Sequence, residues 1–146
     1  MTDSAFRRLH PDARLPVRAH PGDAGFDLHA VAAVEIPPGG RSAVPCGFAI
    51  ALPEGTAALV LPRSGLALRE GVTVLNAPGL IDSGYRGEVM AILVNHDPAA
   101  AFSVSPGDRI AQLVVVDLPD VGFREVEALP ASERGEGGFG STGVAG

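Results

Sequence analysis

Glycine and proline recur so often along this chain that long regular elements have no room to form. Of its 146 residues, 19 are glycine and 13 are proline, near twice the usual shares of about 7% and 5%. Yet 46% of the residues are hydrophobic, which is more apolar mass than a disordered chain carries. The length suits one domain. The pattern therefore predicts a folded domain of many short elements joined by turns, and it argues against a helical bundle.

The apolar segments have the length and spacing of strands in an all-β domain. We expect a strand over 43–52, interrupted near Pro45 and Gly47, and further strands over 56–61, 72–75, 87–95, 101–104, 109–118 and 121–126. One short helix is expected over 64–70, with Ser64 as its N-cap. The valine-rich run 113–116 either lines an interface or fills the core, and its periodicity leaves both open.

Charge and cysteine content exclude several classes of protein. The net charge is −6, whereas a general nucleic-acid binder needs a basic face. All eleven cationic residues are arginines, so an anion site must use arginine, backbone N–H groups or a metal. The single cysteine, Cys46, rules out an intramolecular disulfide and a cysteine-based zinc cluster. No apolar run approaches the roughly 18 residues of a membrane span, and residues 1–20 resemble no secretory signal. We expect a cytoplasmic protein that binds neither nucleic acid nor membrane.

Two segments have candidate binding chemistry at turns. Arg63, Ser64 and Gly65 lie where a strand is expected to enter the short helix, so their side chains and N–H groups can converge on an anion; a capped helix with a surface arginine is the alternative. Residues 79–88 have the pattern of a hairpin turning at Ser83-Gly84. That hairpin would place Asn76 opposite Met90.

At the tip of this hairpin, Asp82 and Tyr85 would flank the turn. Asp82 can instead be a turn-forming carboxylate, and Tyr85, the only tyrosine, can instead be a packing residue. Asp27 and Gln112 are polar residues among apolar ones, within 24–28 and 107–113. Each has a structural alternative as a satisfied buried polar group.

The C-terminal residues 134–146 form a segment of different composition, called the tail below. Six of its thirteen residues are glycine, so ordering it costs much entropy and we expect it to be mobile. Its Gly135-x-Gly137-x-x-Gly140 spacing matches a dinucleotide fingerprint, but no βαβ unit surrounds it, so that interpretation is rejected. Arg134 and flexible backbone N–H groups can still close over a polyphosphate.

Taken together and in order, the segments 24–28, 62–67, 79–88, 107–113 and 134–143 resemble the five motifs of the homotrimeric deoxyuridine triphosphatases (dUTPases). The resemblance implies a jelly-roll-like β protomer over 1–133, a tail over 134–146 that closes over the active site, and a homotrimer with active sites shared between subunits. It also implies hydrolysis of dUTP to dUMP and pyrophosphate with Mg²⁺. That reaction would supply dUMP for thymidylate synthesis and keep uracil out of DNA.

The resemblance also implies residue roles. Asp82 would be the general base that orients a water for in-line attack on the α-phosphorus, and Tyr85 would lie under the deoxyribose. The uracil edge would be read by Asn76, Leu80, Ile81 and Met90. Phosphate oxygens would be held by Arg63, Ser64, Gly65 and Gln112. Asp27 would reach Mg²⁺ through water, with the ion otherwise held by the substrate phosphates.

In the tail, the resemblance implies that Arg134 contacts the γ-phosphate and that Phe139 stacks on uracil, with Gly140 and Ser141 as further nucleotide contacts. Two alternatives remain open. A dCTP deaminase of the same superfamily would use a glutamate, for which Glu88 is the nearest candidate, and it would release ammonia. A non-catalytic trimeric module would bind nucleotide without turnover.

Overall fold

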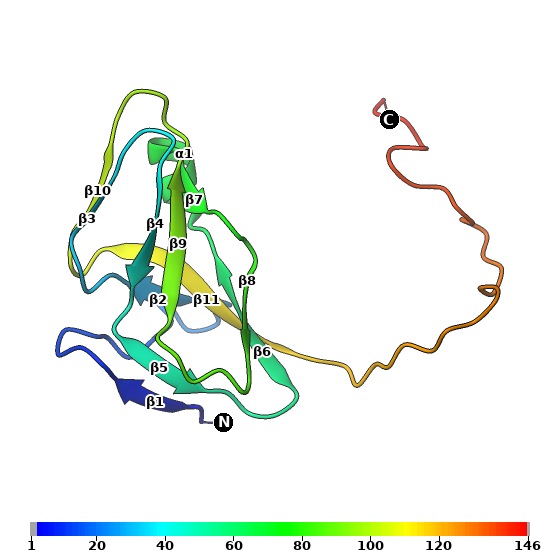
Figure 1. Ribbon diagram of the computed structural model, residues 1–146, viewed down its shortest axis with the longest axis horizontal. Helices are drawn as coiled ribbons and strands as arrows, with labels where there is room; N and C mark the ends of the chain where they lie inside the picture. Colours follow the sequence, from blue (N-terminus) through cyan, green and yellow to red (C-terminus); the bar gives the residue numbers. More distant parts are fainter. Residues whose placement is uncertain (1–2, 146) are drawn as a thin grey trace.

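A β domain and a long C-terminal arm make up residues 3–145, the part of the chain that this computed structural model describes (Figure 1). The domain is built from short strands and one helix, as the density of glycine and proline predicts. In chain order these are β1 (Ala5–Arg8), β2 (Phe26–His29), β3 (Val34–Ile36), β4 (Arg41–Pro45), β5 (Phe48–Ala51), β6 (Thr56–Leu61), α1 (Ser64–Glu70), β7 (Val72–Val74), β8 (Gly79–Asp82), β9 (Met90–Asn95), β10 (Phe102–Val104) and β11 (Arg109–Asp117).

Two antiparallel sheets enclose the core. One has the strand order β2-β11-β6-β8 and the other β4-β9-β7, while β1 pairs with β5 and β10 with β3. Leu28, Phe48, Leu93 and Ile110 are almost fully buried between these layers. Along β11, Leu113 is buried whereas Val115 is 39% exposed, so the valine-rich run contributes to the core and to the surface. The all-β, jelly-roll-like architecture expected from the sequence is confirmed.

The helix forms over 64–70 as expected, but its cap differs from the prediction. Arg63 is the N-cap residue, its backbone is extended, and no side chain caps the helix. Ser64 is therefore the first helical residue, and its assignment as N-cap was wrong. At the other end Gly71 adopts a left-handed conformation with φ of 64° and donates its N–H to the carbonyl of Leu66, as C-terminal glycines do.

The expected strand over 121–126 does not form. Residues 118–145 contain no strand and no helix; we call them the C-terminal arm. Figure 1 shows the arm leaving the end of β11 and running away from the domain. A β-branched sequence needs a neighbouring strand to satisfy its backbone, and within the described chain the arm has none.

The hairpin expected over 79–88 is split between the two sheets. The strands that flank this segment, β7 and β9, pair regularly, since Thr73 of β7 lies opposite Val94 of β9. Further along, β8 pairs with β6 rather than with β9, so the arms separate. The β7–β9 ladder ends at Val74 opposite Leu93, before Asn76, so no strand pairing joins Asn76 to Met90; both residues line the same cavity. The expected tip turn is present, because the Tyr85 N–H donates to the Asp82 carbonyl at 3.0 Å.

No helix within residues 3–145 is long and apolar enough to cross a membrane. The one fully buried polar side chain of the described core is Asn95. Its Nδ2 donates to the carbonyls of Ile36 at 3.1 Å and Ala100 at 2.8 Å, and its Oδ1 accepts from the Asp97 N–H at 2.9 Å. Asn95 therefore ties the end of β9 to β3 and to the loop before β10.

Replacing this side chain tests that role. We expect Asn95→Ala to lower the free energy of unfolding by about 2 kcal/mol, because the buried Ile36 carbonyl and two part-buried backbone groups lose their partners. Urea denaturation measures the change. Ser103→Ala, on an exposed position of β10, is the control and should change stability by less than about 0.5 kcal/mol. A loss below 1 kcal/mol for Asn95→Ala would contradict the role.

Candidate active site

The separation of β8 from β9 opens a cavity of about 320 Å³. This volume lies at the lower end of the range of about 300–1,000 Å³ for small-molecule pockets. The lining includes five of the residues expected to bind the base and sugar, namely Asn76, Leu80, Ile81, Tyr85 and Met90. Ala43, Val60 and Ile92 add apolar walls. A cavity with these apolar walls and the polar Asn76 side chain suits a flat ring that has polar groups along one edge.

The backbone of β8 supplies polar groups at this cavity. β8 is the last strand in its sheet, so only the edge that faces β6 is paired within the described residues. The other edge presents free N–H and C=O groups. Such an edge can hydrogen-bond a planar ligand as a strand or a base would. The geometry thus places a donor and acceptor row beside an apolar pocket.

Tyr85 lines the cavity from the loop that follows β8, and Asp82 ends β8 just before that loop. The Tyr85 side chain is 46% exposed, and its hydroxyl donates to the Glu88 carbonyl at 3.0 Å. Asp82, the last residue of β8, is exposed. Within residues 3–145 its carboxylate has no hydrogen bond and no ion pair to hold it, so it is free to hold a water.

A second polar group lies where β2, β11 and the end of β6 meet. The carboxylate of Asp27 lies 3.8 Å from Arg63 Nε and 3.6 Å from Arg109 Nη1. Arg63 Nη1 also donates to the Arg109 carbonyl at 3.0 Å. Gln112 pairs with Asp27 across the strands, and its amide donates to the Pro62 carbonyl at 2.9 Å. We call Asp27, Arg63, Arg109 and Gln112 the arginine cluster.

The arginine cluster is suited to an anion. Two guanidinium groups face one carboxylate, which leaves one positive charge in excess. Ser64 and Gly65 lie beside Arg63 in the first turn of α1, and no side chain caps that helix end, so its first N–H groups remain available to a ligand. Burial, followed by the charge of Arg14, lowers the pKa of His29 beside the cluster. His29 is therefore neutral at pH 7.

Arg109 was missed as a functional candidate by sequence reasoning. It lies within 107–113, three residues before Gln112, and only the pairing of β11 with β2 brings its side chain to Asp27. The signal available in the sequence was an arginine at a turn-to-strand junction in a chain without lysine. Glu88, by contrast, lines the cavity, but one oxygen of its carboxylate accepts a hydrogen bond from the Gly47 N–H at 2.9 Å.

One chain does not bring Asp82 to the arginine cluster. In β6, Ala57 pairs with Asp82, whereas Leu61 pairs with Gln112. Four residues of strand separate these positions, which is about 13 Å. The carboxylate and the anion-binding group therefore lie toward opposite ends of the same strand.

The chain's own residues provide no complete metal site. Within residues 3–145, no three His, Cys, Asp or Glu side chains gather as possible ligands. Asp27 is the one carboxylate in the arginine cluster, and two guanidinium groups already face it. This donor set does not fit a cage made of protein ligands. It does fit a Mg²⁺ ion that keeps its waters and takes its other ligands from phosphate oxygens.

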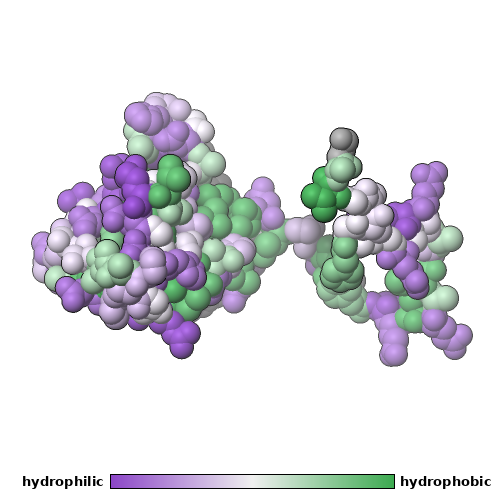
Figure 2. Space-filling view, turned by 90° about the horizontal axis from the view of Figure 1, so that it is seen from above, coloured by the Kyte–Doolittle hydropathy of each residue, from purple (hydrophilic) through white to green (hydrophobic). Residues whose placement is uncertain are grey.

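The tail lies away from both groups. Arg134 Nε donates to the Gly137 carbonyl at 2.8 Å, so this side chain contacts only its own segment. Phe139 is fully exposed, and Gly140 and Ser141 are exposed as well. Figure 2 shows the arm as a separate body beside the domain, with apolar and polar residues interspersed. The structure does not bring Arg134, Phe139, Gly140 or Ser141 to the cavity.

The sequence matches the dUTPase family over residues 12–143. It is 55% identical over 141 residues to the deoxyuridine 5'-triphosphate nucleotidohydrolase of Rhodococcus erythropolis, covering 95% of this chain and 85% of that one. The protein of the same name from Corynebacterium glutamicum is 53% identical over 146 residues, with 98% of each chain covered. In structure, the chain resembles a variant of the Staphylococcus bacteriophage 80alpha dUTPase solved with dUpNHpp, with a TM-score of 0.92, 27% identity and coverage of 99% and 100%.

Cys46 takes no part in this site. Its side chain is 1% exposed, and burial, followed by the negative charge of Glu88, raises the pKa of the thiol to about 12. We expect no reaction with a disulfide reagent such as Ellman's at pH 8 in the folded protein, and one thiol per chain after unfolding. Rapid labelling of the folded protein would contradict this burial.

The same shift predicts a pH dependence of stability. The unfolded chain loses the thiol proton near pH 9, whereas the folded chain keeps it, so the unfolded state binds fewer protons above that pH. Stability should therefore fall between about pH 9 and 12, by at most about 1.4 kcal/mol per pH unit. Cys46→Ala lacks this contribution and should show a shallower decline in urea denaturation.

Proposed function

The chain belongs to the dUTPase family and is a dUTP diphosphatase, and from this premise we propose how its residues divide the work of hydrolysing dUTP to dUMP and pyrophosphate. The cavity between β8 and β9 receives the uracil and the deoxyribose. The arginine cluster receives the triphosphate. The observation that carries this proposal is the lining of the cavity, where the five residues assigned to base and sugar meet beside the free edge of β8.

Base selection follows from hydrogen bonds and shape. The free N–H and C=O groups of β8 at Leu80 and Ile81, with the Asn76 side chain, read the edge of uracil. The apolar walls of the cavity leave no room for a methyl group at C5, which excludes thymine. Tyr85 stacks under the sugar, and its ring takes the space that a 2′-hydroxyl would need. An amino group at C4, as in cytosine, would present a donor where the strand expects an acceptor.

Asp82 is the general base in this proposal. Its exposed carboxylate at the end of β8 accepts a proton from a water and orients that water for in-line attack on the α-phosphorus. The bond between the α-phosphorus and the bridging oxygen breaks, and pyrophosphate leaves. Phosphoryl-type hydrolysis depends mainly on positioning and charge neutralisation, which the rigid strand end and the two arginines supply.

A bound Mg²⁺ would supply further neutralisation of the phosphate charge. It would be held by phosphate oxygens and waters, with Asp27 reaching one of these waters. The chain's contribution is to place Asp27 between Arg63 and Arg109, so that a cation and an anionic substrate can both approach. Gln112, fixed by its bond to the Pro62 carbonyl, and the N–H groups of Ser64 and Gly65 orient the phosphate oxygens.

A homotrimer with shared sites accounts for the distance between the two groups. Asp82 and the arginine cluster of one chain lie toward opposite ends of β6, about 13 Å apart along the strand. A second copy that presents its own cavity next to the arginine cluster would unite base, sugar and phosphate sites. Two measurements test this arrangement. The molecular mass in solution should be that of a trimer, and mixed trimers of an inactive Asp82 variant with an inactive Arg63 variant should regain activity.

The arm has the reach to close such a shared site. The 17 residues from 118 to 134 extend over at most about 60 Å, and the arm projects away from its own domain (Figure 1). The tail then folds over bound nucleotide, with Phe139 on the uracil, Arg134 at the γ-phosphate, and Gly140 and Ser141 against the nucleotide. Closure excludes water and gates product release.

The experiment that tests the function compares four nucleotides. Pyrophosphate release is measured with Mg²⁺ from dUTP, UTP, dTTP and dCTP. Turnover confined to dUTP supports the cavity as a uracil and deoxyribose site. Equal turnover of all four would reject base and sugar recognition. Ammonia release from dCTP would point to the deaminase alternative, and binding without turnover would point to the non-catalytic module.

Removing the base while keeping the side-chain volume gives a sharper test. We expect Asp82→Asn to lower kcat by about 10²- to 10⁴-fold with little change in the Kd for dUpNHpp, since the phosphate contacts remain. Calorimetry gives the Kd and pyrophosphate release gives kcat. Asp117→Asn, at an exposed strand end, is the matched control. A loss of binding as large as the loss of turnover would argue against the role.

Deleting residues 134–146 tests the tail. We expect the β domain to keep its circular dichroism and its oligomeric size, and kcat/KM to fall by about 10²- to 10³-fold, because an arginine and several N–H donors are lost from a phosphate site. A shorter deletion of 144–146 leaves the assigned tail residues in place and is the control. Full activity of the longer deletion would show that the tail does not act as a lid.

A further inference from the structure

The loop between β8 and β9 folds the Tyr85 ring back onto the loop's own backbone. At one end the Tyr85 N–H donates to the Asp82 carbonyl at 3.0 Å. At the other the Tyr85 hydroxyl donates to the Glu88 carbonyl at 3.0 Å. Because both bonds come from the same residue, they fix the backbone and the end of the ring, and the ring spans the peptide between Arg86 and Glu88.

Gly87 lies directly beneath this ring. A methyl group added at Gly87 would lie 2.5 Å from Tyr85 Cζ and 2.9 Å from Cε2, and closer still to the hydroxyl oxygen. Side-chain carbons do not approach other heavy atoms within 3.0 Å, so any larger residue here must displace the ring. The backbone of Gly87 is not in the left-handed region, which means that alanine would be tolerated by the main chain.

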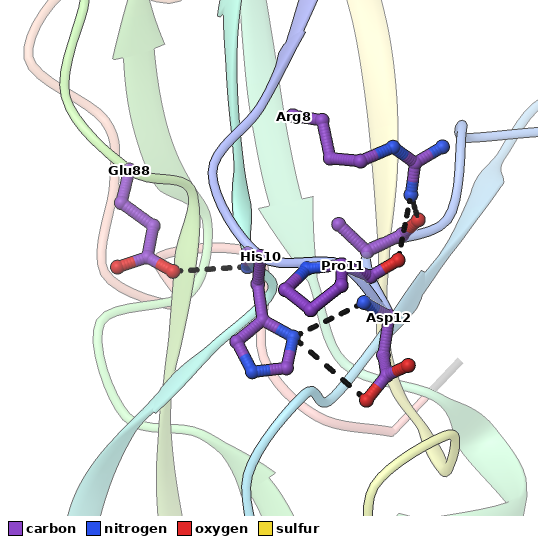
Figure 3. Close-up of polar contacts among 7 residues, drawn as sticks. Arg8, His10, Pro11, Asp12 and Glu88 are labelled. Carbon is purple, nitrogen blue, oxygen red and sulfur yellow. Dashed lines mark hydrogen bonds and ion pairs between the residues drawn. The ribbon is translucent and has the colours of Figure 1, made fainter.

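Glu88 anchors the same loop to the rest of the domain. Its carboxylate accepts the Gly47 N–H at 2.9 Å, and Figure 3 shows this bond beside His10. Val89 continues the attachment, since its N–H donates to the Phe48 carbonyl at 2.8 Å. The Glu88 carbonyl accepts the Tyr85 hydroxyl. Its position is therefore fixed by the Glu88 side chain on one side and by the Val89 N–H on the other.

The anchor point on Gly47 is itself held by several contacts. Its carbonyl accepts the N–H groups of Leu9 at 2.8 Å and His10 at 3.0 Å. Its φ is +75°, and a side chain there would lie 2.8 Å from His10 Cβ and 2.9 Å from Val31 Cγ1. The Gly47 peptide is thus held by hydrogen bonds at its carbonyl and by close packing at its Cα, so the Glu88 carboxylate binds to a well-held backbone group.

We propose that Gly87 and Glu88 are positioning residues for the Tyr85 ring and thereby determine the preference for deoxyribose over ribose. Gly87 does so by leaving space beneath the ring, and Glu88 by holding the hydroxyl's acceptor in place. Gly87 has no side chain, and the Glu88 side chain does not need to touch the substrate. The inference rests on the proposed function, in which Tyr85 lies under the sugar. Beyond that function, it names the residues that keep the Tyr85 ring close enough to the sugar to exclude a 2′-hydroxyl.

The ring position can be observed without any substrate. Tyr85 is the only tyrosine of the chain, so protein labelled with ¹³C-tyrosine gives the NMR signals of one ring. We expect Gly87→Ala to move these ring signals. Gly84→Ala is the matched control in the same turn, because a methyl group at Gly84 meets no atom within 4 Å, and it should leave the ring signals in place.

The second readout is sugar selectivity, expressed as kcat/KM for dUTP divided by kcat/KM for UTP. A pocket that rejects an added hydroxyl by shape discriminates by about 10²-fold, and a ring displaced by about 1 Å forfeits much of that. We expect Gly87→Ala to lower the ratio by about tenfold or more and Gly84→Ala to keep it within twofold. A merely structural defect would lower both kcat/KM values together and leave the ratio unchanged.

Three further variants test the two hydrogen bonds separately, that of the Tyr85 hydroxyl and that of the Glu88 carboxylate. Tyr85→Phe removes the bond to the Glu88 carbonyl without affecting the fold, since the ring is half-exposed, and should lower the ratio about fivefold, the size of one hydrogen bond. Glu88→Gln keeps an acceptor for the Gly47 N–H and should match the unchanged chain, whereas Glu88→Ala should move the ring signals and lower the ratio.

The outcomes distinguish this inference from the function on which it rests. If the unchanged chain fails to hydrolyse dUTP, the proposed function is wrong, and the ring signals still test whether Gly87 and Glu88 position Tyr85. If Gly87→Ala leaves the ring signals and the ratio unchanged, the role of Gly87 is overturned. If Glu88→Ala behaves like Glu88→Gln in both readouts, the role of Glu88 is overturned.

Discussion

Backbone pairing along β6 is the constraint on which the rest of the site depends. This strand pairs with β11 on one edge and with β8 on the other. The first pairing places Gln112 beside the end of β6, and through β2 it brings Asp27 to Arg63 and Arg109. The second places Asp82 opposite Ala57. Because a strand is rigid over this length, the distance between the arginine cluster and the Asp82 carboxylate of one chain is set by the register.

The same pairing creates the cavity. β8 can pair with β6 only by leaving β9, which stays between β4 and β7. The two halves of one hairpin thus belong to different sheets, and the space between them is lined by residues from both. A strand edge that would otherwise be a liability for aggregation becomes a row of donors and acceptors for a ligand. The Gly47 N–H binds the carboxylate of Glu88, which lines the cavity.

A preformed cavity and an extended arm suit the proposed reaction, which depends on positioning. The domain supplies preorganised groups, which need no reorganisation when charge develops. The arm has exposed apolar residues such as Phe123 and Leu129. Beyond the Leu118 N–H, which donates to the Gly55 carbonyl at 2.8 Å, the hydrogen bonds of the described arm lie within the arm itself. A substrate that recruits the arm would therefore couple binding to closure, and release to opening.

The sequence by itself determined the class of fold, the short helix at 64–70, the breaks at glycine and proline, and the segments that contain the site, because turn chemistry and apolar periodicity are local properties. It also pointed to Asp82, Tyr85 and Arg63 through the order of five short motifs. Only the tertiary structure decided that β8 joins β6, that residues 121–126 form no strand, that Arg109 faces Asp27, and that Glu88 binds Gly47. Each of these depends on which strands become neighbours, and the choice of neighbour is made by the packing of distant segments, which no local pattern contains.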